Sequence, residues 1–155
     1  MNTLHDSELI EVTTAAWSTI VGIAIEPTNA CLALPDDSGY VAKIALARED
    51  GYILRLDCSD AAARLAASKF FFVEEHLLST EDIQDTLGEI VNIIAGNIAG
   101  LYHPDGRVGL PEIHERHGQE PLKPEDEVQS LLFACLGSAL RLSILWPQSE
   151  RTQAA

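Results

Sequence analysis

The stretch EDIQDTLGEIVNIIAGNIAGLY, residues 81–102, decides the fold because it predicts one long amphipathic helix. On a helical wheel, one narrow arc is entirely apolar and holds Ile83, Leu87, Ile90, Ile94, Ile98 and Leu101. Ser79, followed three residues later by Asp82, predicts a capping box at the start of this helix. Pro104 cannot continue a helix, so we expect it to end near Leu101.

The opposite side of the same helix is polar, and it also carries two glycines. Asp85, Glu89, Asn92 and Gly96 fall within about 60° of arc on the wheel, and Gly88 lies beside them. A glycine in a helix interior costs about 1 kcal/mol relative to alanine. We therefore expect a smooth surface that a partner approaches closely. A polar outer face is also the ordinary property of a solvated surface helix, so the spacing alone assigns no function.

The rest of the chain predicts a second long helix and a sheet. Residues 6–21 repeat apolar positions at helical spacing, and Gly22 and Pro27 end that helix. YVAKIALAR, residues 40–48, and YILRLDC, residues 52–58, read as two antiparallel strands joined by a turn that contains Gly51. Ser59 or Asp60 can cap a helix over residues 61–71.

Two further segments complete the predicted sheet. GRVGLPEIHER, residues 106–116, reads as a strand with Pro111 inside it, which places that strand at an edge or a bulge. EVQSLLFACL and ALRLSILW, residues 127–136 and 139–146, predict a second hairpin around Gly137. We therefore expect an α+β fold, with a mostly antiparallel sheet packed against two long helices.

Length and charge limit the classes of partner. The 155 residues suit a single domain over 1–155, with a tail from about residue 147 that we expect to be flexible. A formal charge of −14 argues against nucleic acid or an anionic membrane as the partner. The acidic N-terminal segment does not resemble a signal peptide, and the apolar run at 130–146 is interrupted by Arg141, so we expect a cytoplasmic protein with no membrane span.

Other candidate sites are weaker. His103, Glu112, His114 and His117 lie close in sequence, but a strand would turn His114 and His117 to opposite faces, so we predict no metal site. No histidine adjoins Cys58 or Ser59 to activate a nucleophile. Three widely spaced cysteines indicate buried, reduced thiols. We expect Trp17 and the aromatic residues Phe70, Phe71 and Phe72 to fill the core or a dimer surface.

The string GEIVNIIAGN, residues 88–97, resembles the helix motif of the CheC/CheX/FliY family of chemotaxis phosphatases. That motif is an acidic residue or serine, three residues, Glu, two residues and Asn, and it falls here on Asp85, Glu89 and Asn92. Residues 50–71 and 106–115 are similar to the family's glycine-led strand with its alanine-rich helix and to its later proline-containing strand. A single helix of this kind resembles the CheX branch, although the 18 residues between Asn92 and Pro111 suggest a trimmed loop.

The resemblance implies a phosphatase acting on the aspartyl-phosphate of a CheY-type response regulator, with the chain as a homodimer. Asn92 would orient the attacking water, Glu89 would dock on the regulator's lysine, and Asp85, Gly88 and Gly96 would complete the contact. No cofactor is expected in this chain, because Mg²⁺ is expected on the regulator. The alternative is a non-catalytic interaction module of a chemotaxis, flagellar-switch or other two-component pathway.

Overall fold

The computed structural model describes residues 4–28, 38–46, 52–102, 107–117 and 127–145. Its centre is a six-stranded sheet in the order β1-β5-β6-β3-β2-β4, in which every neighbouring pair is antiparallel. The strands are β1 (Glu26–Pro27), β2 (Ser38–Ala45), β3 (Ile53–Ser59), β4 (Glu112–His117), β5 (Glu127–Cys135) and β6 (Ser138–Leu145). The helices are α1 (Asp6–Val21), α2 (Asp60–Phe71), the 3-10 turn η1 (Glu75–Leu77) and α3 (Thr80–Tyr102).

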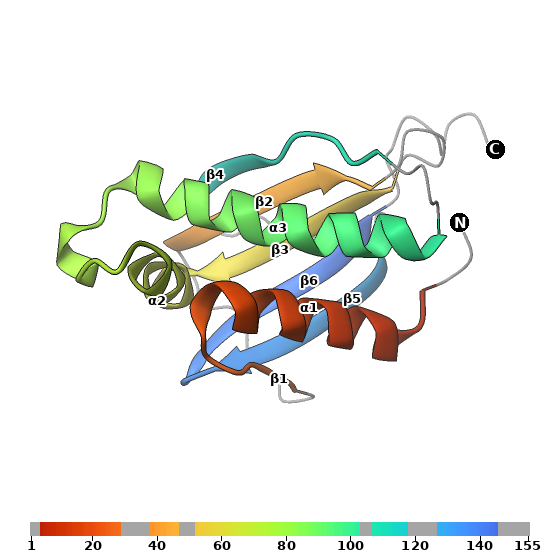
Figure 1. Ribbon diagram of the computed structural model, residues 1–155, viewed down its shortest axis with the longest axis horizontal. Helices are drawn as coiled ribbons and strands as arrows, with labels where there is room; N and C mark the ends of the chain where they lie inside the picture. The colour runs from red at the N-terminus through yellow and green to blue at the C-terminus, as the bar shows by residue number, and fades with distance from the viewer. Residues whose placement is uncertain (1–3, 29–37, 47–51, 103–106, 118–126, 146–155) are drawn as a thin grey trace.

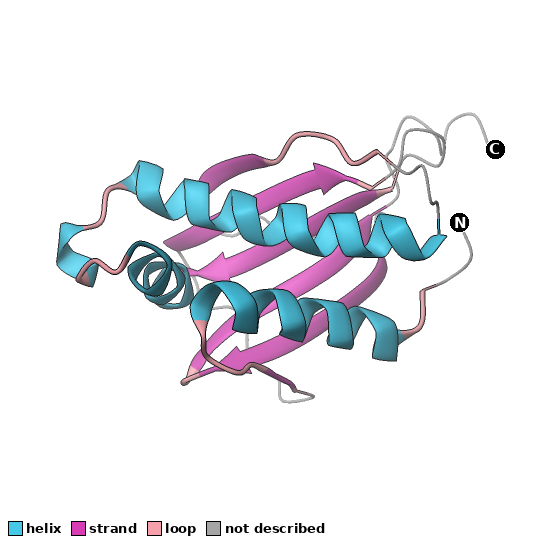
Figure 2. Ribbon diagram, viewed as in Figure 1, coloured by secondary structure: helices cyan, strands magenta, loops and turns pink. Residues whose placement is uncertain are grey.

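The three α-helices cover one face of the sheet (Figures 1 and 2). Helices α1 and α3 lie next to each other along this face and pack together, while α2 is seen nearly end-on beside the N-terminal half of α3. The α+β prediction with two long helices is confirmed, and α2 is a shorter third helix of the same layer.

The core lies between this helical layer and the sheet. Five residues of the predicted apolar arc of α3 are at most 1% exposed: Ile83, Leu87, Ile90, Ile94 and Ile98. Trp17 of α1 is fully buried, as predicted, and alanines on α2 let that helix approach closely. Leu101, the sixth member of the predicted arc, is instead 56% exposed, because it lies in the last turn of α3 and has passed the core.

Both predicted hairpins are confirmed. Strands β2 and β3 pair with Val41 opposite Asp57, and β5 and β6 pair with Phe133 opposite Leu140. Leu136 and Gly137 both have positive φ in the second turn, which fits the geometry of a two-residue hairpin loop. Gly51, predicted in the first turn, lies outside the described residues, as does the tail from residue 147.

Pro111 stands immediately before β4 rather than inside it, and β4 is an edge strand, as its proline predicted. The strand carries five charged or histidine side chains among its six residues, which discourages pairing with another chain. Within the described residues, none of the helices combines the length and apolar character needed to span a membrane.

Candidate functional site

The N-terminus of α3 is fixed by the predicted capping box. The Ser79 backbone N–H donates to Asp82 Oδ2 at 3.0 Å, and the Asp82 N–H donates to Ser79 Oγ at 3.1 Å. The Thr80 hydroxyl donates to Glu115 Oε1 at 3.2 Å, which ties this end of the helix to edge strand β4. The helix therefore starts at a defined residue, and that start sets the direction of every side chain after it.

Gly88 holds the middle of α3 against the segment that leads into β4. A Cβ at this position would lie 3.3 Å from Ile113 Cδ1 and 3.7 Å from Pro111 Cγ. Gly88 is thus buried within the chain, although the sequence suggested that it would lie on an open surface. Packing inside the chain accounts for this glycine without a partner.

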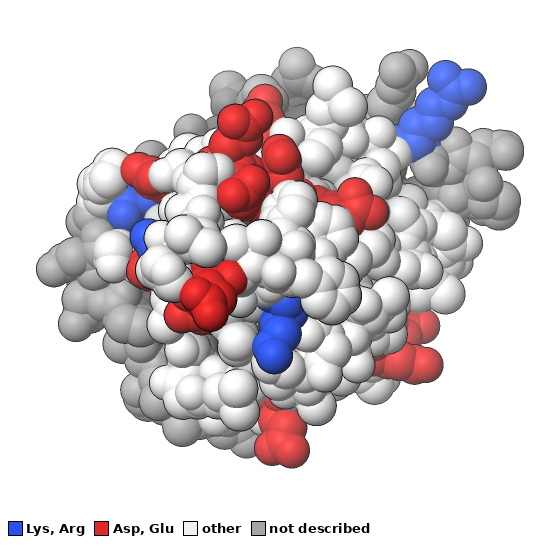
Figure 3. Space-filling view, turned by 60° about the vertical axis from the view of Figure 1, so that its left-hand side comes forward, with Lys and Arg blue, Asp and Glu red and all other residues white. Residues whose placement is uncertain are grey.

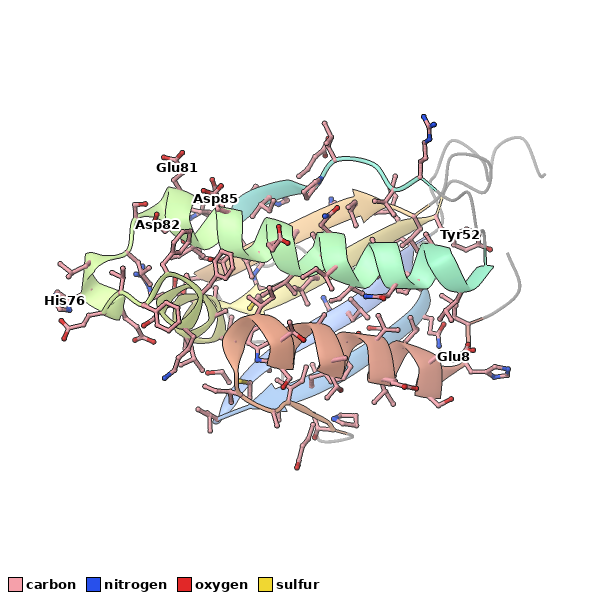
Figure 4. All side chains as sticks on the ribbon, in the orientation of Figure 1. Glu8, Tyr52, His76, Glu81, Asp82 and Asp85 are labelled. Atoms are coloured by element: carbon pink, nitrogen blue, oxygen red, sulfur yellow. The ribbon has the colours of Figure 1, made fainter. Side chains whose placement is uncertain are left out.

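Asp85, Glu89, Asn92 and Gly96 are all exposed on the outer side of α3, and we call this set the outer stripe. Figure 4 shows Asp85 projecting outward from the first turns of the helix, near Glu81. Glu89 follows Asp85 by about 6 Å along the helix axis, and Asn92 follows Glu89 by about 4.5 Å. A Cβ at Gly96 would meet no atom within 4 Å, so the predicted smooth surface is present there.

The polar groups of the outer stripe are free to face a partner. Among the described residues, Asp85 and Glu89 form no ion pair and the Asn92 carboxamide has no hydrogen-bond partner. Asn97, by contrast, is engaged, because its side-chain amide donates to the Ile93 carbonyl at 2.9 Å. Figure 3 shows Asp and Glu side chains gathered on the end of the molecule that carries the start of α3. The surface around the stripe therefore favours a basic group on a partner.

The competing sites find no support. His114 and His117 lie in β4, where their spacing turns them to opposite faces, and the His117 ring is instead 3.3 Å from Glu115 Oε2. The described parts of the chain hold no group of three or more possible metal ligands, and His103 lies outside them. The metal site therefore has no geometric basis within the described residues.

The two nucleophile candidates have structural roles. Cys58 is fully buried, and burial raises the pKa of its thiol well above the ordinary value, which keeps it protonated. Ser59 caps α2, with its Oγ accepting from the Ala62 N–H at 3.2 Å. Cys58 and Cys135 are both buried and unbonded, as predicted, while Cys31 lies outside the described residues.

One feature was missed by the sequence reasoning, and one expectation is narrowed by the structure. Phe72 is 94% exposed and Phe71 is 38% exposed, so these two rings do not fill the core, and the dimer surface stays a prediction for them. A buried ion pair lies on β3, where Arg55 Nε and Nη2 donate to the Asp57 carboxylate at 2.9 and 2.7 Å. The alternation of β3 places both residues on the face opposite Leu54 and Leu56, and this spacing could have predicted the pair.

Comparison with known proteins identifies a family and several solved structures that resemble this chain. The family described as "Chemotaxis phosphatase CheX" matches residues 41–135. Among curated protein sequences, none matches the chain. The solved structure of CheX from Vibrio vulnificus is 14% identical, with a TM-score of 0.72, over 95% of this chain and 100% of that one. CheX from Desulfovibrio desulfuricans is 16% identical, with a TM-score of 0.66, over 91% and 97%.

A third similar structure comes from a complex of CheX, CheY, BeF3 and Mg²⁺ from Borrelia burgdorferi. It is 18% identical, with a TM-score of 0.62, over 90% of this chain and 95% of that one. At such identities the structural likeness shows the shared fold. The family match adds the sequence evidence, since it spans more than half of the chain and includes the whole outer stripe. The chain belongs to the CheX family of chemotaxis phosphatases.

Proposed function

We propose that this chain accelerates hydrolysis of the aspartyl-phosphate of a CheY-type response regulator. The observation that carries the proposal is the exposed Asn92 carboxamide, free of partners among the described residues, one turn beyond an exposed Glu89 on a rigid helix. A carboxamide buried or bonded inward would instead have favoured the non-catalytic module. Membership of the CheX family and the likeness to a CheX chain solved with CheY support this partner class.

Asn92 would act by positioning a water molecule. In a phosphorylated receiver, bound Mg²⁺ and a lysine already neutralise the phosphoryl group, so hydrolysis lacks chiefly a water in line with the leaving oxygen. A carboxamide can donate one hydrogen bond to that water and accept another, and it does not compete as a nucleophile. A hundredfold acceleration requires about 2.7 kcal/mol of barrier lowering, which is reasonable for orientation alone.

Glu89 would dock the helix on the receiver. Its exposed carboxylate, unpaired with any described Lys or Arg, can form an ion pair with the receiver's lysine. Asp85, one turn earlier, would supply a second contact with the same partner, and Gly96 would leave room for close approach beyond Asn92. The outer stripe thus separates binding, through its carboxylates, from catalysis, through its amide.

The test is phosphate release from CheY-type receivers of the same organism, charged with acetyl phosphate. Asn92→Ala should abolish the acceleration with little loss of binding, whereas Glu89→Ala and Glu89→Lys should weaken binding. Asn97→Ala is a matched control, because it removes a carboxamide of the same helix that is engaged with Ile93. Full activity in Asn92→Ala would exclude the mechanism, and binding of a receiver without acceleration by the wild type would favour the interaction module.

We also propose that the working unit is a homodimer with one outer stripe on each subunit. The family resemblance is its support. Sedimentation equilibrium of the purified chain tests it directly, and a monomer at the concentrations that give full activity would contradict it.

A further inference from the structure

Three large apolar side chains are exposed in the segment that runs from the end of α2 to the 3-10 turn η1. Phe71 is 38% exposed, Phe72 94% and Leu77 65%, and we call these three residues the apolar corner. The other large exposed hydrophobic residues of the described chain are Leu101, Leu110 and Leu136, and no two of them lie within a seven-residue stretch. The apolar corner spans seven residues on α2 and η1, which contact each other, and a concentration of exposed apolar residues often marks a contact site.

Phe72 has an unfavourable backbone as well as an exposed ring. It is the C-cap of α2, with φ 56° and ψ 44°, a left-handed conformation in which glycine is the favoured residue. A glycine here would adopt the positive φ without steric strain, and it would no longer expose an aromatic ring to water. The stability of the chain alone therefore does not account for Phe72.

The turn that carries Phe72 is braced by hydrogen bonds. The Phe72 and Val73 N–H groups both donate to the Ser68 carbonyl, and the Ser68 hydroxyl donates back to the Val73 carbonyl at 2.6 Å. The rings of Phe70 and Phe71 meet edge to face, with centroids 5.0 Å apart. The exposed ring is thus held on a fixed turn, which lowers the entropy that a binding partner would have to remove.

The apolar corner adjoins the surface that carries the outer stripe. Helix α2 packs against α3, and η1 leads directly into the first turn of α3 (Figures 1 and 4). Exposed Glu74 and Glu75 lie between Phe72 and Leu77 in sequence, Glu81 and Asp85 follow in the first two turns of α3, and Lys69 is the one exposed lysine of the last turn of α2. A partner with an apolar patch beside basic groups would match both features, because carboxylates beside an apolar centre favour basic groups on a partner.

We propose that the apolar corner is a second contact for the phosphorylated receiver domain, next to its phosphorylation site. This inference rests on the proposed function, in which the receiver's lysine meets Glu89. The apolar corner would increase the affinity for the receiver through the Phe72 ring, while Asn92 would increase the rate of aspartyl-phosphate hydrolysis. Contact surfaces commonly concentrate their binding energy in a few aromatic residues of this kind.

The experiment compares the wild type with Phe72→Gly, a substitution that also favours the folded backbone. Binding is measured with a CheY-type receiver loaded with Mg²⁺ and beryllofluoride, and phosphate release gives KM and kcat. We expect Phe72→Gly to raise Kd and KM by about tenfold with kcat unchanged. Leu77→Ser should act in the same direction. Leu136→Gly is the matched control, since it removes an exposed apolar side chain at positive φ from the β5–β6 turn, whereas α3 packs against β2, β3 and β4.

The outcomes separate this inference from the proposed function. An unchanged Kd for Phe72→Gly, in a chain that still accelerates dephosphorylation, would overturn the second contact and leave the phosphatase proposal standing. Weaker receiver binding in Phe72→Gly without any turnover by the wild type would support the contact and refute the phosphatase. If Phe72→Gly dissociates a dimer in sedimentation while receiver binding is unchanged, the corner joins two copies of the chain and the inference is wrong.

Discussion

Replacing Gly96 with alanine adds one methyl group to the outer stripe at a position where it meets no atom within 4 Å. The only stability term that changes is then helix propensity, which favours alanine over glycine by about 1 kcal/mol in a helix interior. For a chain of this length, that gain corresponds to a rise in Tm of about 2–4 °C. Gly96→Ala should therefore be more stable than the wild type.

Gly88→Ala provides the internal comparison. The same gain in helix propensity is opposed there by the contact with Ile113 Cδ1 at 3.3 Å and with Pro111 Cγ at 3.7 Å. These atoms would have to move by a few tenths of an ångström, so we expect a smaller gain than in Gly96→Ala or a net loss. Urea denaturation followed by circular dichroism measures both differences under one set of conditions.

The functional arm of this prediction uses the same variant. If a receiver approaches α3 closely one turn beyond Asn92, the Gly96→Ala methyl group lies in its path and kcat/KM for phosphate release should fall. A stabilised Gly96→Ala with full activity would refute close approach at Gly96 while leaving the role of Asn92 intact. If Gly96→Ala is not more stable than the wild type, the space around Gly96 is not open as described.

Three further predictions concern stability. Ser79→Ala removes the Oγ acceptor at the start of α3 and should lower the free energy of unfolding by about 1 kcal/mol in urea denaturation. Asp57→Ala removes the carboxylate that pairs with buried Arg55 and should cost about 3–5 kcal/mol in the same assay; a loss below about 1 kcal/mol would show that the pair is not desolvated. Burial raises the pKa of Cys58 above its ordinary value of 9.0, so the folded chain keeps a proton that the unfolded chain releases. Stability should therefore fall as the pH rises above about 9, and a Cys58→Ala variant should show a shallower decline.

Much of the fold follows from local sequence because its signals agree with the tertiary structure. The apolar arc of α3 and its capping box predicted the helix and its start, and the proline before β4 predicted an edge strand. The two-residue strand β1 and the short turn η1 were not predicted. Each is too short for a periodic pattern, and β1 exists only through its pairing with β5.

The sequence predicted which residues of the candidate site lie on the outer face of α3, but it did not predict how the rest of the chain packs around them. The helical wheel placed Asp85, Glu89 and Asn92 on the outer face, where the structure also has them exposed. The same wheel could not reveal that Gly88 is covered, because Pro111 and Ile113 come from a segment that follows the helix. For Phe72, hydrophobicity left the core and a dimer surface both open, and the sequence did not reveal that this residue ends α2 in a left-handed conformation with its ring exposed.

The capped start of α3 fixes the spacing and direction of the side chains that this helix carries. Inserting one residue between Glu89 and Asn92 would rotate the carboxamide by about 100° around the helix axis and move it about 1.5 Å along that axis. The amide would then leave the side of the helix on which Glu89 lies, even though Asp85, Glu89 and Asn92 were all retained. Under the proposed function, redesign of this protein for a different regulator should therefore vary the edges of the stripe and keep the three-residue step from Glu89 to Asn92 unchanged.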